Sequence, residues 1–153
     1  MRITLREIEN TIREFAAIIN APKEFIPTFG SSNQTGLPHI EIHEGQYIII
    51  VCENGVELTR ESFEDPDALV FKVLEDISFS MACDLVYKDT SDQNFRERFL
   101  AIQQNFLSKI NRYAKYKENE KLQQDTITTK KTRALSEYRK KRLLKRKTHK
   151  TAS

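Results

Sequence analysis

The chain has 153 residues, which fits one domain with an appendage and is long enough to bury a core without a disulfide or metal. Its net charge of +3 conceals an asymmetry: residues 130–153 carry eleven Lys or Arg and one acid (+10), whereas residues 1–129 carry 14 bases and 21 acids (−7). Two cysteines do not make a secreted disulfide framework. No run approaches the ~18 apolar residues of a membrane span, and no signal peptide is evident at the start. We therefore expect a cytoplasmic protein.

The first predicted element is an amphipathic helix over residues 4–21. Thr4 and Glu7 have the spacing of a capping box, and Pro22 should end the helix. Its apolar positions recur at intervals of three and four: Leu5, Ile8, Ile12, Phe15, Ala16 and Ile19. Residues 22–38 are expected to form a linking loop.

A three-stranded antiparallel meander is predicted next, over residues 39–43, 46–53 and 56–60. The middle strand is apolar on both faces, and Asn54-Gly55 is a strong hairpin-turn signal. Ile40 and Ile42 should face the helices, because they are the only apolar residues of their strand. The opposite, open face of the sheet should then carry His39, Glu41 and His43.

Two long helices are predicted to follow and to pack on one sheet face, which gives an α+β fold. Asp65 and Pro66 are a typical helix start, and that helix should run to about Lys88. The last helix is expected over residues 92–117, with an inner stripe at Phe95, Phe99, Ile102, Phe106, Ile110 and Tyr113. We predict a domain over residues 1–117, a linker or fraying helix over 118–129, and a basic tail over 130–153.

The residues give no sign of catalysis, a metal or a cofactor. His39 and His43 share a strand face but lie ~13 Å apart, too far for one zinc ion. Cys52 and Cys83 have no metal-binding neighbours at the usual spacings, and neither lies at a helix N-terminus that would stabilise a thiolate. The four glycines do not form a phosphate-binding loop. We therefore predict a binding protein rather than an enzyme.

Two charged surfaces are candidates for binding a partner. The first is the open sheet face with its hairpin, where a basic protein partner would meet His39, Glu41, His43, Glu53, Asn54 and Glu57. The second is the tail, where contact with nucleic acid or another polyanion would use Arg139, Lys140, Lys141, Arg142, Lys145, Arg146 and Lys147. The alternatives are a solvated sheet face, and a tail that is a solvating extension or folds back on the acidic body.

Several short segments of the sequence resemble the immunity protein 63 family of bacterial polymorphic toxin systems. The resemblance spans about residues 5–115. It is carried by the segments 26–30 (IPTFG), 38–42 (PHIEI), 47–51 (YIIIV), 53–58 (ENGVEL), 79–82 (FSMA) and 94–98 (NFRER), with Ala101 and Gln103.

The resemblance implies a cytoplasmic antidote that binds and blocks a cognate toxin domain and does no chemistry of its own. The alternative is a nucleic-acid-associated protein that uses the basic tail.

Overall fold

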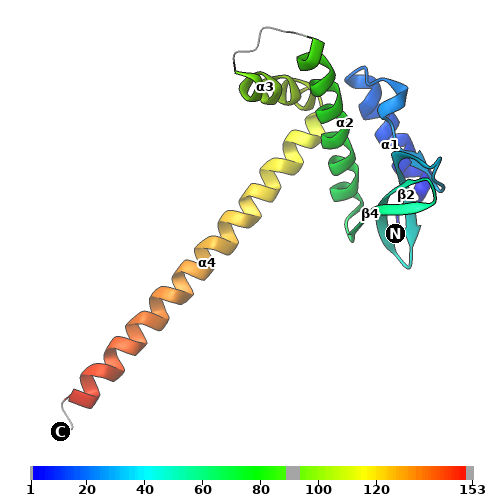
Figure 1. The fold of residues 1–153 in the computed structure, drawn as a ribbon. Helices are drawn as coiled ribbons and strands as arrows, with labels where there is room; N and C mark the ends of the chain where they lie inside the picture. The colour runs from blue at the N-terminus through cyan, green and yellow to red at the C-terminus, as the bar shows by residue number, and fades with distance from the viewer. Residues whose placement is uncertain (1, 89–93, 151–153) are drawn as a thin grey trace. The chain divides into compact units, whose positions relative to one another are not determined.

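The computed structural model describes residues 2–88 and 94–150, and for residues 149 and 150 the backbone alone (Figure 1). The chain divides into two compact units, residues 1–113 and residues 114–153. The division separates the charges. The first unit has 11 Lys or Arg and 18 Asp or Glu (−7), and the second has 14 and 4 (+10).

The α+β fold begins with α1, which spans Leu5–Ile18. The predicted capping box is confirmed: Glu7 N–H donates to Thr4 Oγ1 (3.2 Å), and Thr4 N–H donates to Glu7 Oε2 (2.7 Å). The helix ends earlier than predicted, because Asn20 adopts a left-handed conformation with φ of 54° ahead of Pro22. A short 3₁₀ turn, η1 (Lys23–Phe25), follows.

The sheet has four strands rather than the predicted three. Their order is β1-β2-β3-β4, with bounds Thr28–Phe29, Thr35–His43, Gln46–Glu53 and Val56–Phe63. The predicted meander is β2-β3-β4, and its two turns lie at Glu44-Gly45 and Asn54-Gly55, where all four residues have positive φ. The missed strand, β1, pairs with β2 in parallel and makes the sheet mixed. With only two residues it has no readable alternation, so the sequence suggested a loop.

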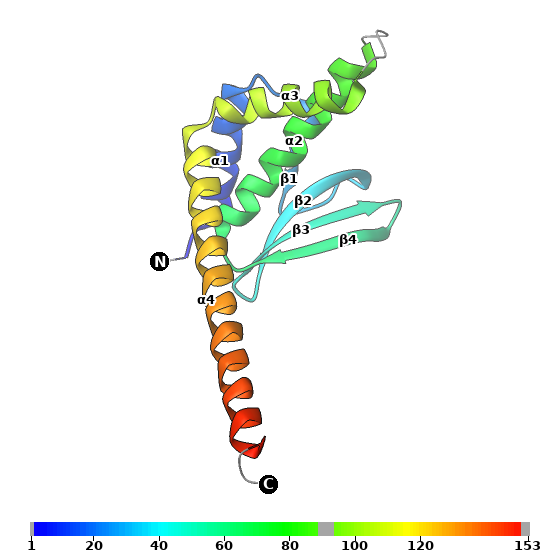
Figure 2. The ribbon, with the colours of Figure 1, turned by 90° about the vertical axis from the view of Figure 1, so that its left-hand side faces the viewer.

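Both faces of β3 are buried, as predicted for the central strand. Figure 2 shows α2 (Pro66–Lys88) lying along one side of the sheet. Ile49 lies beside Val73 and Ile77 of this helix, so the odd-numbered side chains of β3 face α2. Ile48 and Ile50 point to the opposite side, which we call the outer face. The register of the strands assigns to it the residues His39, Glu41, His43, Gln46, Ile48, Ile50, Arg60 and Ser62.

The predicted helix at residues 66–88 is confirmed as α2. Asp65 Oδ1 accepts a hydrogen bond from Asp67 N–H (3.0 Å), which places Asp65 at the N-terminus of the helix as expected. Further along α2, Glu75 anchors the following helices: its carboxylate accepts from Tyr113 Oη (2.8 Å), and its carbonyl accepts from Gln103 Nε2 (3.2 Å).

The single last helix predicted over residues 92–117 is wrong, because the structure has two helices there, α3 (Phe95–Ser108) and α4 (Asn111–Lys150). The predicted start at Asp92 lies outside the described residues. Neither glycine nor proline marks the break between α3 and α4. Lys109 and Ile110 instead donate to carbonyls three residues back, a tighter turn, while Leu107 and Ile110 are buried. Tertiary burial therefore sets the bend, and no local sequence signal announces it.

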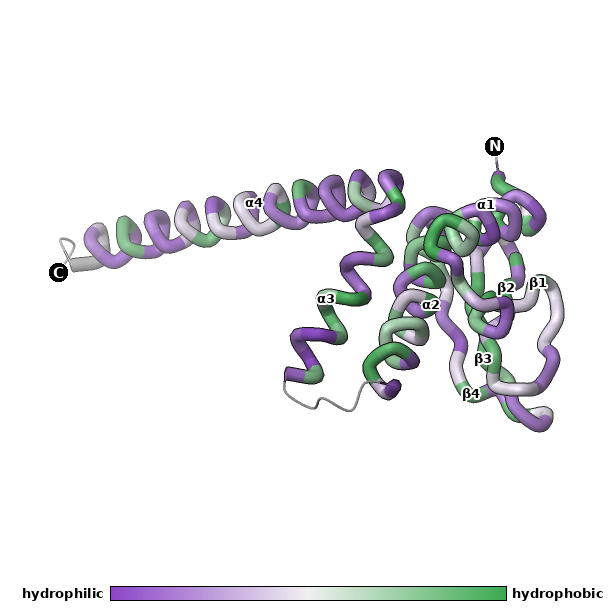
Figure 3. Tube along the Cα trace, turned by 90° about the horizontal axis from the view of Figure 1, so that it is seen from above, coloured by the Kyte–Doolittle hydropathy of each residue, from purple (hydrophilic) through white to green (hydrophobic). Residues whose placement is uncertain are grey.

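α4 is uninterrupted from Asn111 to Lys150, and all of its side chains from 121 to 148 are exposed. Hydrophilic residues dominate this helix, and its apolar residues form only short stretches between them (Figure 3). Residues 118–129 are helical, and the predicted boundaries at 117 and 130 remain predictions. In the described part of the chain, no helix combines the length and the apolar character that crossing a membrane requires.

Candidate partner-binding site

His39 and Glu41 form the first pair on the outer face. The prediction that His39 is exposed there is wrong: it is only 4% exposed, because it lies beside the central strand in the row His39–Ile50–Arg60. Its Nε2 lies 3.1 Å from Glu41 Oε1, whereas its Nδ1 has no hydrogen-bond partner among the described residues. The Glu41 side chain is 37% exposed. Glu41 therefore both satisfies a buried imidazole and presents a carboxylate to solvent.

Glu57 and Arg60 form a second pair, on β4. Arg60 Nε and Nη2 donate to the two carboxylate oxygens of Glu57 at 2.8 and 2.9 Å, a bidentate arrangement. These hydrogen bonds lower the pKa of Glu57, and the charges of Arg60 and His39 lower it further. Glu57 was predicted as a contact for a basic partner. The structure places it in an ion pair with Arg60, a residue that the sequence did not single out.

The two pairs are electrostatically linked across the sheet. Besides its hydrogen bonds with Glu57, Arg60 feels the charge of Glu41, which helps to raise its pKa. Ile48 and Ile50 point into the same face and are only 4% and 2% exposed. The outer face is therefore a layer of charged side chains over a small apolar floor. Ile42, predicted to face the helices, is 37% exposed near the end of β2.

The hairpin tip at Asn54-Gly55 is held by Gln34, a second residue that the sequence analysis missed. Gly55 N–H donates to Gln34 Oε1 (2.7 Å), and Asn54 N–H donates to the Gln34 carbonyl (3.4 Å). Glu53 and Asn54 are exposed beside this contact. The tip thus presents a carboxylate and an amide on a fixed backbone. No local pattern of residue types signals a contact between residues so far apart in the chain.

His43 and Glu44 lie at the other end of the strands. His43 Nε2 is 3.8 Å from Glu44 Oε1, and both side chains are well exposed, at 69% and 84%. The six predicted contact residues therefore differ in position. Four of them have exposed side chains along the outer face and at its hairpin tip: Glu41, Glu53, Asn54 and Glu57. His43 lies at the far turn, and His39 is buried beneath Glu41.

An exposed aromatic ladder on α2 and α3 is a second surface that the sequence analysis did not identify. Phe99 is buried, and its ring lies 4.8 Å from the centroid of Phe79 and 6.4 Å from that of Phe95, which in turn lies 6.1 Å from Tyr87. Phe79, Phe95 and Tyr87 are 51%, 44% and 76% exposed. Aromatic side chains are enriched at protein interfaces. The helical spacing had suggested that Phe95 belongs to the core, but Phe95 lies at the rim.

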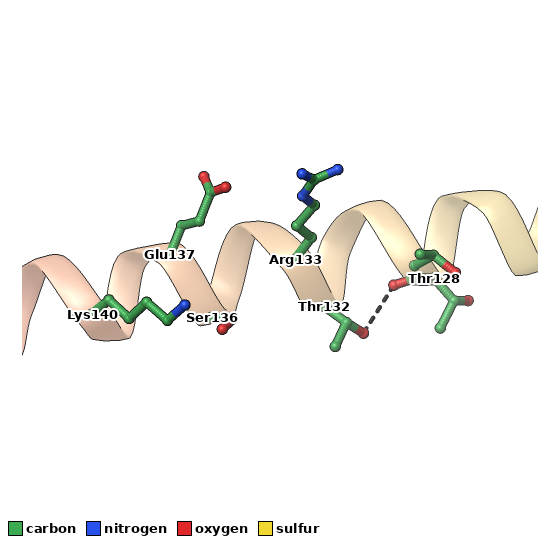
Figure 4. A pocket seen from close by; sticks show the side chains of 7 residues that line it. Thr128, Thr132, Arg133, Ser136, Glu137 and Lys140 are labelled. Atoms are coloured by element: carbon green, nitrogen blue, oxygen red, sulfur yellow. Dashed lines mark hydrogen bonds between the residues drawn. The ribbon is translucent and has the colours of Figure 1, made fainter.

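The described residues contain no cluster of three or more His, Cys, Asp or Glu side chains that could hold a metal ion. Cys52 and Cys83 are free and half-buried. On α4, the predicted polyanion-binding residues Arg139–Lys147 are exposed. The hollow beside them is lined by side chains of this one helix, including Thr132, Arg133 and Lys140 (Figure 4). A hollow bounded by one helix is a surface feature rather than a pocket that encloses a ligand.

Comparison with known proteins identifies the family of this chain. Searches of curated proteins and of solved structures gave no match. A family model, immunity protein 63, matches residues 44–125, which is more than half of the chain. The matched range includes the β3–β4 hairpin and the aromatic ladder. The segments 26–30 and 38–42, which also carry the resemblance to the family, precede it. The predicted family is therefore confirmed: this chain belongs to the immunity protein 63 family.

Proposed function

We propose that the chain binds a cognate protein toxin domain in the cytoplasm and blocks its activity without doing chemistry of its own. The observation that carries the proposal is the family match over residues 44–125. Proteins of this family are typically non-catalytic, which agrees with the prediction that the chain is not an enzyme. The immunity role also fits a compact unit 1 with a net charge of −7.

The toxin contact that we propose is the outer face together with the hairpin tip. Three features support it. The Glu57–Arg60 pair and the Gln34 anchor fix the geometry of side chains and backbone before a partner arrives, which lowers the cost of binding. Glu41 and Glu53 supply negative charge, which would speed association with a basic toxin. Ile48 and Ile50 give these polar groups an apolar floor.

A protection assay tests the function. The toxin domain and the chain are co-expressed from separate inducible promoters, and growth is measured. The wild-type chain should restore growth. A chain that is made in soluble form and leaves the cells unprotected against every candidate toxin encoded beside it would contradict the proposal.

The surface is tested with a matched pair of charge changes. Glu41→Gln keeps an acceptor for His39 and removes the charge, and it should weaken toxin binding about tenfold, or ~1.4 kcal/mol. Glu14→Gln makes the same charge change on the exposed side of α1 and should leave binding unchanged. If Glu41→Gln binds like wild type while Tyr87→Ala weakens binding, the toxin contacts the aromatic ladder instead.

A further inference from the structure

The C-terminal half of α4 carries a dense and exposed set of cations. Between Lys130 and Lys147 there are ten Lys or Arg and one acid, Glu137, and every side chain in this stretch is exposed. Toxin neutralisation by unit 1 gives these cations no role. The residues that carry them also lie beyond the segment that matches the family model. The basic half of α4 therefore has no role in the proposed toxin contact.

The charges surround the helix rather than line one side of it. Successive residues are rotated by about 100°, so the four consecutive cations Arg139–Arg142 cover about 300° of the circumference, and Lys145–Lys147 point between them. A flat lipid surface would meet only one side of such a helix. The segment also lacks the narrow apolar face that an interfacial helix requires, since Leu135, Tyr138, Leu143 and Leu144 are spread over about 240° of the circumference with cations between them.

The same arrangement places like charges close together along the helix. Arg142 lies three residues before Lys145 and four before Arg146, and like charges at these spacings destabilise a helix. Side chains that are exposed all round contribute no packing to offset this repulsion. An anion that approached from several sides would relieve the repulsion and stabilise the helix.

A nucleic-acid duplex presents phosphates on both sides of its groove and can therefore surround a basic helix with negative charge. The major groove of B-form DNA admits an α-helix and places a phosphate backbone on each side of it, whereas the major groove of duplex RNA is too deep and narrow. The 18 residues from Lys130 to Lys147 span about 27 Å, a length along which DNA carries roughly 16 phosphates. Tyr138 is the only aromatic side chain in this stretch, so a platform for stacking single-stranded bases is absent from it.

We propose that Lys130–Lys147 of α4 binds double-stranded DNA, with the helix in the major groove and its cations on the flanking phosphates. The affinity of this contact should depend on the charge of the DNA and the shape of its groove rather than on base sequence. It goes beyond toxin neutralisation and does not rest on it, because the two activities use different units of the chain.

The test is binding of the full chain to a fluorescent 24-base-pair DNA duplex, followed by anisotropy between 50 and 200 mM NaCl. If about six cations contact phosphates, the affinity should fall about a thousandfold across this range. Circular dichroism of the protein should show more helix when the duplex is added. Anisotropy that does not change with DNA, or binding that salt does not weaken, overturns the proposal.

Two variants with the same change in net charge locate the contact. Replacing Arg139, Lys140, Arg142 and Lys145 by Gln removes four cations from α4 and keeps good helix formers in place. The salt effect should then shrink to about tenfold. The control replaces four exposed cations outside Lys130–Lys147 by Gln: Arg6, Lys23, Lys115 and Lys121. The control should bind DNA like wild type. An equal loss of DNA affinity in both variants would show that net charge alone determines binding, and it would refute Lys130–Lys147 as the site.

Three other probes decide the class of partner. Single-stranded DNA of the same length, duplex RNA and vesicles of anionic lipid should each bind at least tenfold more weakly than duplex DNA at the same salt concentration. Equal or tighter binding to the single strand or the RNA excludes the groove, and preferred binding to vesicles assigns the helix to a membrane surface. If none of the four probes binds, the cations of α4 are neutralised by other groups, such as the acidic side chains of unit 1. That result also overturns the proposal.

Discussion

The Glu41–His39 pair gives the sharpest test of how the outer face is built. His39 is 4% exposed, and the contact of its Nε2 with Glu41 is its one side-chain hydrogen bond among the described residues. Glu41→Ala would leave both ring nitrogens buried without a partner. Leaving a buried polar group unsatisfied costs about 1–3 kcal/mol. We therefore expect Glu41→Ala to lower the free energy of unfolding by about that amount.

Urea denaturation measures this loss, with the wild type, Glu41→Gln and Glu44→Ala compared at pH 7. Glu41→Gln should lose less than Glu41→Ala, because an amide oxygen still accepts from the imidazole. Glu44→Ala removes a carboxylate that lies 3.8 Å from an exposed histidine and should have little effect. If Glu41→Ala unfolds at the same urea concentration as wild type, water or another group satisfies His39, and the pair does not support the outer face.

Three further predictions concern the rest of the chain. In the same urea assay, Leu107→Ala should lower the free energy of unfolding by about 2–5 kcal/mol and Phe106→Ala by clearly less, because Leu107 is buried and Phe106 only partly so. A larger loss for Phe106→Ala would show that the buried side of α3 is assigned wrongly. Hydrogen bonds from the Thr4 backbone and hydroxyl lower the pKa of Glu7, so its contribution to stability should be lost as the pH falls below the ordinary glutamate range, and Glu7→Gln should flatten that part of the pH profile. Truncation after Thr129 should shift the melting temperature of unit 1 by only a few degrees, and loss of soluble protein would show that the tail is part of the core.

Much of the fold could be predicted where local chemistry determines the structure. The capping box at Thr4, the proline start of α2 and the turn at Asn54-Gly55 each depend on residues a few positions apart. The two-residue strand β1 and the bend at Lys109-Ile110 depend on contacts with distant segments, and no local pattern encodes such contacts.

The candidate site was predicted correctly in outline, but its details were wrong because they depend on contacts between different strands. Alternation along β2 correctly assigned His39 and Glu41 to one face. Burial of His39 depends on its neighbours Ile50 and Arg60 on two other strands, which alternation in one strand does not reveal. The pairing of Glu57 with Arg60 follows a bulge where Val51 pairs with Thr59 but Cys52 pairs with Glu57, and that irregularity has no signature in the residue types.

The most direct test of toxin neutralisation is a titration of the purified cognate toxin domain with the purified full-length chain, with toxin activity as the readout. Toxin activity should fall in proportion to the chain added and be abolished near a one-to-one ratio. Glu41→Gln should require more protein for the same inhibition, and Glu14→Gln should not. Full toxin activity in the presence of a tenfold excess of folded chain would contradict direct neutralisation.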